Sequence, residues 1–236
     1  MQRYFVKEKD NNNLILEKDD LHHIKNVMRN KVGDLIECIY NEQLYICKIE
    51  ELTSNKVTII EIKEDNNELT LDITIAIALV KEQKMDLILQ KLTELGVARI
   101  IPVKMEHSIV KLDEKRFEHK KERWQKICKE ASEQSKRNKI PEITNLMTIK
   151  DLEKLEIDYK FVCSTKTQEN LVNNYLQDLN KCAKIIFTIG PEGGISTSEE
   201  KELTEHGFIP ISLGKRIMRV ETAAIYVASI INFCNM

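Results

Sequence analysis

The segment from residue 185 to residue 233 limits the possible folds more than any other part of the chain. Two short runs, Ile185–Ile189 and Ile209–Leu213, are rich in β-branched residues, as strands buried on both faces usually are. The first run is followed by Gly-Pro-Glu-Gly-Gly at 190–194, the second by a glycine-bearing loop at 214–219, and each loop leads into a predicted helix. Two strand ends, two glycine loops and two helix starts predict a ligand crevice at the carboxyl edge of a sheet.

Both predicted helices of this segment have recognisable ends. Ser196 with Glu199 and Thr197 with Glu200 each fit a capping box, and Gly207 is a suitable residue to end the first helix. The second helix follows Glu221 and is apolar on nearly all sides, which predicts that it is buried.

Composition excludes several classes of protein. The 236 residues are 42% hydrophobic and 31% charged, which is ordinary for a folded globular protein. The longest apolar runs, such as Ile75–Val80 and Ala223–Ala228, are far too short to span a bilayer. The first ten residues lack the apolar core of a signal peptide, so we expect a cytoplasmic location.

The cysteines and histidines do not predict a metal site. None of the six cysteines forms a C-x-x-C pair with another, so free and mostly buried thiols are expected. The pair His22-His23 has no cysteine or carboxylate pattern nearby. We therefore expect no metal.

Residues 1–68 read as a small β-rich domain. Glycine and asparagine turns separate short strand candidates, and there is room for one short helix at 22–30. The strand candidates are Leu14–Leu16, Leu35–Tyr40, Leu44–Ile49 and Val57–Ile62. This pattern suits a small β-barrel, and the polar run 64–68 is the expected boundary to a second domain, 69–236.

The second domain alternates strands and helices. Strands are expected at Leu71–Val80, Arg99–Val103 and Tyr159–Cys163, with a helix after the first and a basic helix from about 114 to 136. Such alternation predicts an α/β domain with a mainly parallel sheet.

The net charge of −2 conceals an uneven distribution. Residues 111–140 carry eleven Lys and Arg against six Asp and Glu. A nucleic-acid-binding protein needs a basic face and not a basic total, so this stretch qualifies. An ordinary solvated helix explains the same charges equally well.

The familiar catalytic and nucleotide-binding patterns are missing. Neither G-x-G-x-x-G nor G-x-x-x-x-G-K-[ST] occurs, which disfavours dinucleotide-binding and P-loop proteins. G-x-S-x-G and H-E-x-x-H do not occur either. A glycine-lined crevice with arginines and a carboxylate beside it remains, and it fits either a transferase or an anion-binding module.

Four blocks of sequence, in order along the chain, resemble one known family. GPEGG at 190–194 with LGKRIMRVETAA at 213–224 resembles the RsmE family of bacterial 16S rRNA uracil-N3 methyltransferases, of the SPOUT class. KMDLILQKLTELGV at 84–97 and EASEQSKRNKIPEI at 130–143 resemble further signatures of that family. HHIKNVMRNKVGD at 22–34 resembles its PUA-like RNA-binding domain.

The resemblance implies a fold and a reaction. The fold is an α/β SPOUT methyltransferase domain with a C-terminal trefoil knot, preceded by a small β-barrel PUA-like domain, and the protein is a homodimer. The reaction moves a methyl group from S-adenosylmethionine to N3 of uridine 1498 in 16S rRNA of the small ribosomal subunit. Two alternatives stay open: a related SPOUT enzyme acting elsewhere on RNA, for example at a ribose 2′-hydroxyl, or a catalytically idle RNA-binding protein.

The resemblance also implies which residues hold the cofactor. They are Ile189, Gly190, Pro191, Glu192, Gly193, Gly194, Leu213, Gly214, Ile217, Met218, Thr222 and Ala223. Glu192 would take a ribose hydroxyl of the cofactor or, equally, hold its own loop in place.

Three residues are expected to carry the chemistry. Uracil N3 becomes nucleophilic when its proton leaves, so charge spreading onto O2 and O4 needs a cation, for which Arg219 is the first candidate and Arg216 the second. Glu221 would accept the proton as general base or would form a salt bridge that orients an arginine.

RNA contacts are expected from cationic side chains outside the crevice. The candidates are Arg3, Lys25, Arg29, Lys31, Lys136 and Arg137. The chain departs from the family pattern at His107-Ser108, where an arginine commonly precedes the serine, so a constant positive charge at that position is in doubt.

Overall fold

The computed structural model describes residues 1–176 and 182–234, and the chain divides into two compact units. One unit comprises Met1–Glu68 together with Ser132–Lys139, and the other comprises Leu69–Ala131 and Ile140–Met236. The expected division into 1–68 and 69–236 did not include the return of Ser132–Lys139 to the first unit. Long-range hydrogen bonds of Arg3 and Glu68 with residues 136–139 account for this return.

The first unit is a six-stranded mixed sheet in the order β1-β4-β5-β6-β3-β2. β1 pairs with β4 in parallel, and the other neighbours are antiparallel. The short helix α1 and a π-helical turn, η1, lie between β3 and β4. The bounds are β1 Arg3–Phe5, β2 Glu8–Asp10, β3 Asn13–Ile15, α1 Lys18–His22, η1 His23–Val27, β4 Leu35–Tyr40, β5 Gln43–Lys48 and β6 Lys56–Lys63.

The sheet of the first unit curls without closing. β1 and β2 are its two edges, yet only Val6 and Lys7 separate them along the chain. A link of that length spans at most about 11 Å, so the edges must lie near each other. Among the described residues, however, β1 pairs only with β4 and β2 only with β3. The closed barrel expected from the sequence is therefore corrected to a curled half-barrel.

The second unit is built on a seven-stranded sheet whose recorded pairings are all parallel, which confirms the α/β prediction. The order is β10-β8-β7-β12-β11-β13, with β9 also pairing with β8. The strands are β7 Asp72–Ala78, β8 Arg99–Lys104, β9 Glu142–Ile143, β10 Met147–Thr148, β11 Tyr159–Cys163, β12 Lys184–Ile189 and β13 Ile209–Ile211. The helices are α2 Glu82–Glu94, α3 Glu114–Gln134, α4 Ile149–Glu153, α5 Asn173–Leu176, α6 Thr197–Glu205 and α7 Val220–Cys234.

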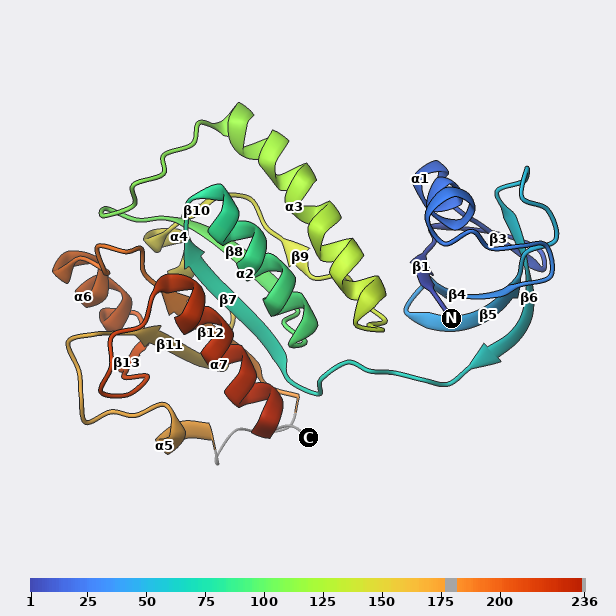
Figure 1. Ribbon diagram of the computed structural model, residues 1–236. Coiled ribbons are helices and arrows are strands. Elements are labelled where there is room, and N and C mark those ends of the chain that lie inside the picture. The colour runs from blue at the N-terminus through green and yellow to red at the C-terminus, as the bar shows by residue number, and fades with distance from the viewer. Residues whose placement is uncertain (177–181, 235–236) are drawn as a thin grey trace. The chain divides into compact units, whose positions relative to one another are not determined.

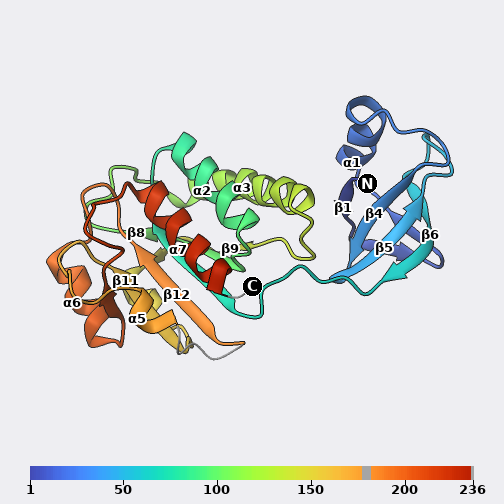
Figure 2. The ribbon, with the colours of Figure 1, turned by 60° about the horizontal axis from the view of Figure 1, so that its bottom comes forward.

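Helices cover both faces of the parallel sheet, as Figures 1 and 2 show. On β7, Ile73, Ile75 and Ile77 belong to the hydrophobic core that includes α2, α3 and α7. The intervening Ala76 and Ala78 belong to the core on the other face, with residues of α4 and α6. A strand buried on both faces reads as a continuous apolar run, which is why the sequence signal was strong.

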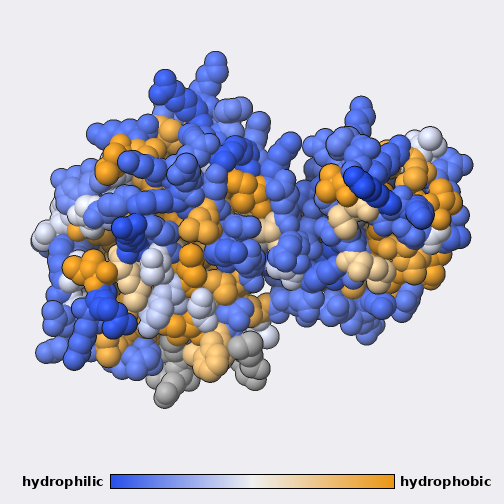
Figure 3. Space-filling model, in the orientation of Figure 1, coloured by the Kyte–Doolittle hydropathy of each residue, from blue (hydrophilic) through white to orange (hydrophobic). Residues whose placement is uncertain are grey.

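α2 and α7 lie side by side on one face of the sheet (Figures 1 and 2). The surface in Figure 3 is mainly hydrophilic, with some apolar atoms exposed over these two helices. Within residues 1–176 and 182–234, no helix is long and apolar enough to cross a membrane. The same residues contain no group of three or more His, Cys, Asp or Glu side chains arranged to hold a metal ion.

Candidate active site

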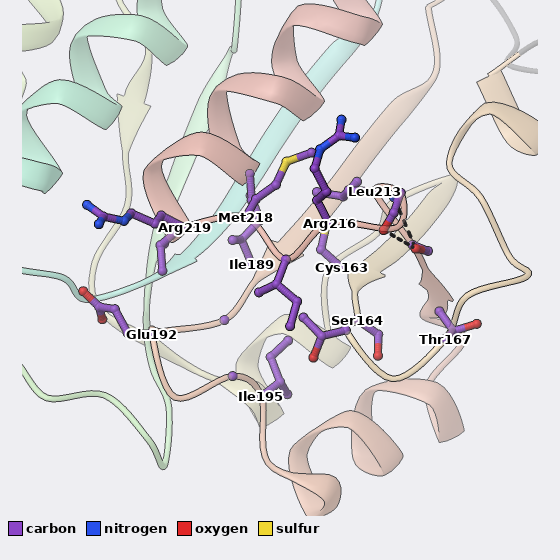
Figure 4. A pocket seen from close by; sticks show the side chains of 18 of the residues that line it. Cys163, Ser164, Thr167, Ile189, Glu192, Ile195, Leu213, Arg216, Met218 and Arg219 are labelled. Carbon is purple, nitrogen blue, oxygen red and sulfur yellow. Dashed lines mark hydrogen bonds between the residues drawn. The ribbon is translucent and has the colours of Figure 1, made fainter.

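Three neighbouring strands of the parallel sheet, β12, β11 and β13, end at the same edge, and the loops that follow them enclose a cavity (Figure 4). The cavity volume is about 570 Å³, which suits a small organic ligand. All three walls come from the second unit. The crevice predicted at the carboxyl edge of the sheet is therefore present.

The loop after β12 approaches the cavity as bare backbone. A Cβ on Gly190 would lie 2.5 Å from Ile195 Cγ1 and 3.0 Å from the Ile195 backbone nitrogen, so a side chain has no room there. A Cβ on Gly193 would lie 2.9 Å from the His107 Cβ. Gly194 has φ +75° and donates its N–H to the Pro191 carbonyl oxygen at 2.8 Å. The glycines thus make a tight turn that only residues without a side chain can form.

The helix after this loop begins where one of the two capping boxes predicted. Ser196 is the N-cap of α6, and its hydroxyl accepts a hydrogen bond from the Glu199 backbone nitrogen. The Glu199 carboxylate accepts one from the Ser196 backbone nitrogen in return. Thr197 is already the first helical residue, so the alternative box is not the one used.

The loop after β13 is fixed at its start by a serine. The Ser212 hydroxyl accepts a hydrogen bond from the Gly214 backbone nitrogen at 3.2 Å, and Gly214 has φ +119°, which favours glycine. The chain then continues through residues 215–219 along the cavity to α7. This second loop was predicted from its glycine and its cations.

A third wall, Cys163–Gln168, was not predicted. Ser164 donates a hydrogen bond to Glu200 at 2.8 Å, and Lys166 forms an ion pair with the other oxygen of that carboxylate at 3.0 Å. The segment contains no glycine and no helix start, so its only signal was the end of strand β11 in the same sheet. Burial raises the pKa of the Cys163 thiol to about 12, which makes this part of the wall neutral.

Most of the predicted cofactor residues line the cavity. They are Ile189, Gly190, Pro191, Glu192, Gly193, Gly194, Leu213, Gly214, Ile217, Met218 and Ala223. Thr222 does not line it and is exposed on α7. Lys215, a cation of the predicted second loop, also lines the cavity, and sequence reasoning missed Ile195, Glu200, Ser212 and Val220.

Both candidate arginines line the cavity and are exposed. Figure 4 shows Arg219 on the side of Glu192, and Arg216 on the side of Leu213, with Met218 between the two arginines. Neither guanidinium makes a hydrogen bond or an ion pair with any described residue. Two cations next to a cavity with no internal partner are available to an anionic ligand.

The carboxylates of Glu192 and Glu221 are both close to one lysine of α2. Lys84 Nζ lies 2.8 Å from Glu192 Oε1 and 3.7 Å from Glu221 Oε2. The hydrogen bond to Glu192 raises the pKa of the Lys84 ammonium group, and it lowers the pKa of the Glu192 carboxyl. Glu221 does not line the cavity. The sequence suggested a salt bridge between Glu221 and an arginine, and the structure shows a salt bridge with Lys84 instead.

His107 lies against the glycine loop. Its Nδ1 is 3.1 Å from the Gly194 carbonyl oxygen, and its Cβ occupies the space beside Gly193. The imidazole is exposed and therefore accessible at the rim of this loop.

Half of the predicted RNA contacts have internal partners in the first unit. The Arg3 side chain is 2% exposed and pairs with Glu37 at 2.9 Å. The Arg137 side chain is 4% exposed and pairs with Glu68 at 2.5 Å. Lys136 is more exposed but also pairs with Glu37, at 2.9 Å. Burial and carboxylate partners favour a structural role for Arg3 and Arg137 over contact with phosphate.

The other three predicted RNA contacts lie on one short segment around η1. Arg29 and Lys31 are exposed and Lys25 is half-buried. None of the three makes an ion pair with a residue in the part of the chain that the structure describes. Exposed apolar side chains, Val27 and Met28, lie between them in sequence.

Comparisons with known proteins agree with this geometry. A family of RNA methyltransferase domains matches residues 67–232, and a family of RNA methyltransferase PUA domains matches residues 16–62. The chain is 35% identical to ribosomal RNA small subunit methyltransferase E of Bacillus subtilis, over 99% of this chain and 96% of that protein. It is 38% identical to the protein of the same name from Mesomycoplasma hyopneumoniae, over 96% of each chain.

A solved structure is also similar along nearly the whole chain. It is ribosomal RNA small subunit methyltransferase E from Neisseria gonorrhoeae, bound to S-adenosylmethionine. The TM-score is 0.86 at 29% identity, covering 98% of this chain and 96% of that one.

Proposed function

Because the chain belongs to the RNA methyltransferase family, we propose that it transfers a methyl group from S-adenosylmethionine to N3 of uridine 1498 in 16S rRNA. The observation that carries the proposal is the cavity at the ends of β11, β12 and β13, with two unpaired arginines beside it. The names of the relatives in Bacillus and Mesomycoplasma support small-subunit rRNA as the substrate.

The residues around the cavity suit S-adenosylmethionine. When bound, this cofactor supplies an electrophilic methyl group on a positively charged sulfur. The bare backbone at Gly190 and Gly193 leaves N–H and C=O groups within reach of an adenosine, and the cavity volume of about 570 Å³ is large enough for it. The cofactor found in the Neisseria structure supports the same assignment.

The chemistry of uracil gives Arg219 and Arg216 their roles. N3 attacks only after losing its proton, and the resulting negative charge spreads onto O2 and O4. A guanidinium that is already in place and unpaired stabilises this anion without reorganising at the moment of reaction. Arg219 is the first choice because it lies between the glycine loop and the start of α7, and Arg216 is the second.

The general base is a separate question, and the geometry of Glu221 favours a salt bridge. Its carboxylate does not line the cavity, and Lys84 is 3.7 Å away. A general base must lie within hydrogen-bond reach of the proton that it removes. We therefore assign Glu221 to the charge arrangement around Arg219 and not to proton transfer.

RNA contacts are proposed for Lys25, Arg29 and Lys31 of the PUA-like unit. Their ammonium and guanidinium groups form no ion pair with a described residue, although Lys31 interacts electrostatically with Asp34, so they can release counterions on meeting phosphate. Arg3, Lys136 and Arg137 are left out of this set because Glu37 and Glu68 already pair with them.

The proposal includes a trefoil knot and a homodimer. A sheet order in which β12 lies between β7 and β11, and β11 between β12 and β13, is compatible with a chain that returns through an earlier loop. The exposed apolar side chains of Tyr226 and Phe233 on α7 suit burial against a second copy. Sedimentation of the wild-type protein beside Phe233→Glu tests the dimer, since a monomeric wild type would contradict it.

The decisive experiment is mass spectrometry of nucleosides from 16S rRNA. Ribosomal subunits from cells that lack this protein are incubated with the purified protein and S-adenosylmethionine, and Arg219→Ala is the matched inactive control. We expect 3-methyluridine at position 1498 to be missing before incubation and restored only by the wild type.

Other outcomes separate the alternatives. Restoration of a 2′-O-methylated nucleoside would identify a related enzyme of different chemistry. No change in any nucleoside, together with binding of rRNA, would identify an idle RNA-binding protein.

A further inference from the structure

Lys84 is the one cation that the described ion pairs place between two carboxylates at the rim of the candidate active site. It belongs to the first turn of α2, a helix that contributes nothing to the cavity lining. Its partners come from two different segments: Glu192 from the glycine loop after β12, and Glu221 from the first turn of α7. A single ammonium group therefore links the glycine loop after β12 to the start of α7.

The position of Lys84 is fixed by the helix that carries it. The Lys84 backbone nitrogen donates to the Lys81 carbonyl oxygen at 3.0 Å, at the start of α2. The neighbouring residues Met85, Ile88 and Leu89 are fully buried. A cation on a well-packed helix makes a better-defined partner than one on a loop.

Glu221 depends on this lysine. Its Oε2 atom is buried and makes no hydrogen bond with any described residue, and its ion pair is with Lys84 at 3.7 Å. A buried carboxylate oxygen without a counter-charge raises the free energy of the folded protein. Loss of Lys84 would therefore favour an ion pair between Glu221 and another cation.

Arg219 is one alternative cation, besides Lys81, which interacts electrostatically with Glu192. Arg219 precedes Glu221 by two residues, it interacts electrostatically with Lys84, and Figure 4 shows it on the same side of the cavity as Glu192. The Arg219 guanidinium has no ion pair with any described residue.

We propose that Lys84 is a positioning residue: its ammonium group pairs with Glu192 and Glu221 and thereby leaves the Arg219 guanidinium free to meet an anionic substrate. The consequence for catalysis rests on the proposed function, whereas the consequence for Arg219 itself can be measured on the protein alone. Lys84 touches neither the substrate nor the cofactor in this scheme.

The test compares Lys84→Met with Lys84→Arg and with a triple variant that adds Glu192→Gln and Glu221→Gln. Lys91→Met is the matched control, because Lys91 lies on the same helix and pairs with Glu94 at 2.8 Å, outside the cavity. The first readout is the rate at which phenylglyoxal, an arginine reagent, modifies Arg219, followed by mass spectrometry of the peptide. Arg216 in the same protein is the internal reference.

We expect Arg219 to react at least several-fold more slowly in Lys84→Met than in the wild type, while Arg216 is unchanged. Lys84→Arg and the triple variant should restore the wild-type rate, the first by replacing the cation and the second by removing the competing carboxylates. An unchanged Arg219 rate in Lys84→Met, or no recovery in the triple variant, would overturn the proposal. A merely structural lysine would not be rescued by deleting its partners.

The second readout is turnover. At saturating S-adenosylmethionine, Lys84→Met should lower kcat for rRNA methylation by at least tenfold, and Lys84→Arg should recover most of kcat. If the wild type methylates no RNA, the proposed function fails while the phenylglyoxal result still decides the role of Lys84.

Discussion

At the scale of single residues, the most consequential feature is an arginine that is left unpaired. Arg219 borders the cavity, is exposed, and makes no ion pair with the described residues, although it lies on the same side of the cavity as Glu192 (Figure 4). Unpaired cations beside a cavity are unusual, because a carboxylate within reach is normally taken. Their presence indicates that charge is held ready for a ligand.

Replacing this arginine tests its role directly. Arg219→Ala should reduce the methyl-transfer rate by about 10²- to 10³-fold, the usual effect of losing one donor to a developing anion. Affinity for S-adenosylmethionine, measured by calorimetry, should stay within a few-fold of the wild type. A collapse of cofactor binding would instead show that Arg219 holds the loop.

Gly190 offers a second test at this scale. Gly190→Ala would place a Cβ 2.5 Å from Ile195 Cγ1 and 3.0 Å from backbone, so the loop must shift. We expect loss of cofactor binding and a decrease of about 1–3 kcal/mol in the free energy of unfolding. Gly207→Ala is the control: Gly207 has φ +86°, unlike Gly190, but nothing lies within 4 Å of its Cβ, so cofactor binding should persist.

Sequence reasoning found the residues whose role depends on their own backbone conformation. Gly190, Gly193 and Gly214 were predictable because glycine at a strand end has few other reasons to be there. Ser164 and Glu200 were not, since their place at the cavity depends on which strands become neighbours in the sheet.

At the scale of elements, the loop after β12 is fastened to α2 through the pair Lys84–Glu192. The pKa of the Glu192 carboxyl is lowered from an ordinary 4.5. The stabilisation that its charged form contributes is therefore fully present above pH 4.5 and is lost as pH falls through the lowered pKa. The pKa of the Lys84 ammonium group is raised from 10.5. The stabilisation that its charged form contributes is therefore fully present below pH 10.5 and is lost as pH rises through the raised pKa.

The contribution of this pair to cofactor affinity should therefore be constant over a wide pH range. We expect the ratio of S-adenosylmethionine affinities between wild type and Glu192→Gln to be constant from about pH 5.5 to about pH 9.5 and to approach one in more acidic solution. Calorimetry across this range would show it. A ratio that varies near pH 7 would mean that another group titrates at the loop.

The segment just after α3 shows what a count of charges leaves out. Charge alone fitted an RNA-binding face and an ordinary solvated helix equally well, and Arg137 is buried against Glu68, whose carboxylate also accepts hydrogen bonds from the Asn138 and Lys139 backbone nitrogens. Such partners, far away in sequence, cannot be seen from charge counts. The short strands β1, β2, β9 and β10 were missed for a related reason: two or three residues carry no periodicity.

Removal of that arginine should show its structural role. Arg137→Ala leaves the Glu68 carboxylate buried without its counter-charge, and we expect a loss of about 3–5 kcal/mol in the free energy of unfolding. Arg29→Ala, at an exposed position, should change stability by less than about 0.5 kcal/mol and weaken RNA binding instead. Urea denaturation and filter binding would measure the two effects, and the reverse pattern would return Arg137 to the RNA contacts.

At the scale of the whole molecule, the α/β class and the parallel sheet followed from the alternation of strand and helix patterns along the sequence. The set of chain segments that make up the first unit could not be predicted in this way. That unit combines Met1–Glu68 with Ser132–Lys139. The Arg3 guanidinium donates to the carbonyl oxygen of Arg137 and to the Asn138 side chain, both at 3.1 Å. A domain boundary drawn along the sequence cannot include partners supplied by a later segment.

A fragment limited to residues 1–68 should consequently be unstable. Arg3 and Glu68 would lose the hydrogen bonds made with residues 136–139, and we expect a broad, low-temperature thermal transition by circular dichroism. A second fragment in which Ser132–Lys139 is joined to residue 68 by a Gly-Ser linker should melt cooperatively. Equal stability of both fragments would contradict the role given to the returning segment.

This discontinuity also sets an order of events during synthesis. Residues 1–68 of the first unit precede the second unit along the chain and leave the ribosome before it, but the final segment of the first unit emerges about seventy residues after Glu68. At roughly 5–20 residues per second, the curled sheet waits several seconds with Arg3 and Glu68 lacking those partners. β7, α2 and β8 are translated during that wait, so these parts of the second unit are made before the first unit can be completed.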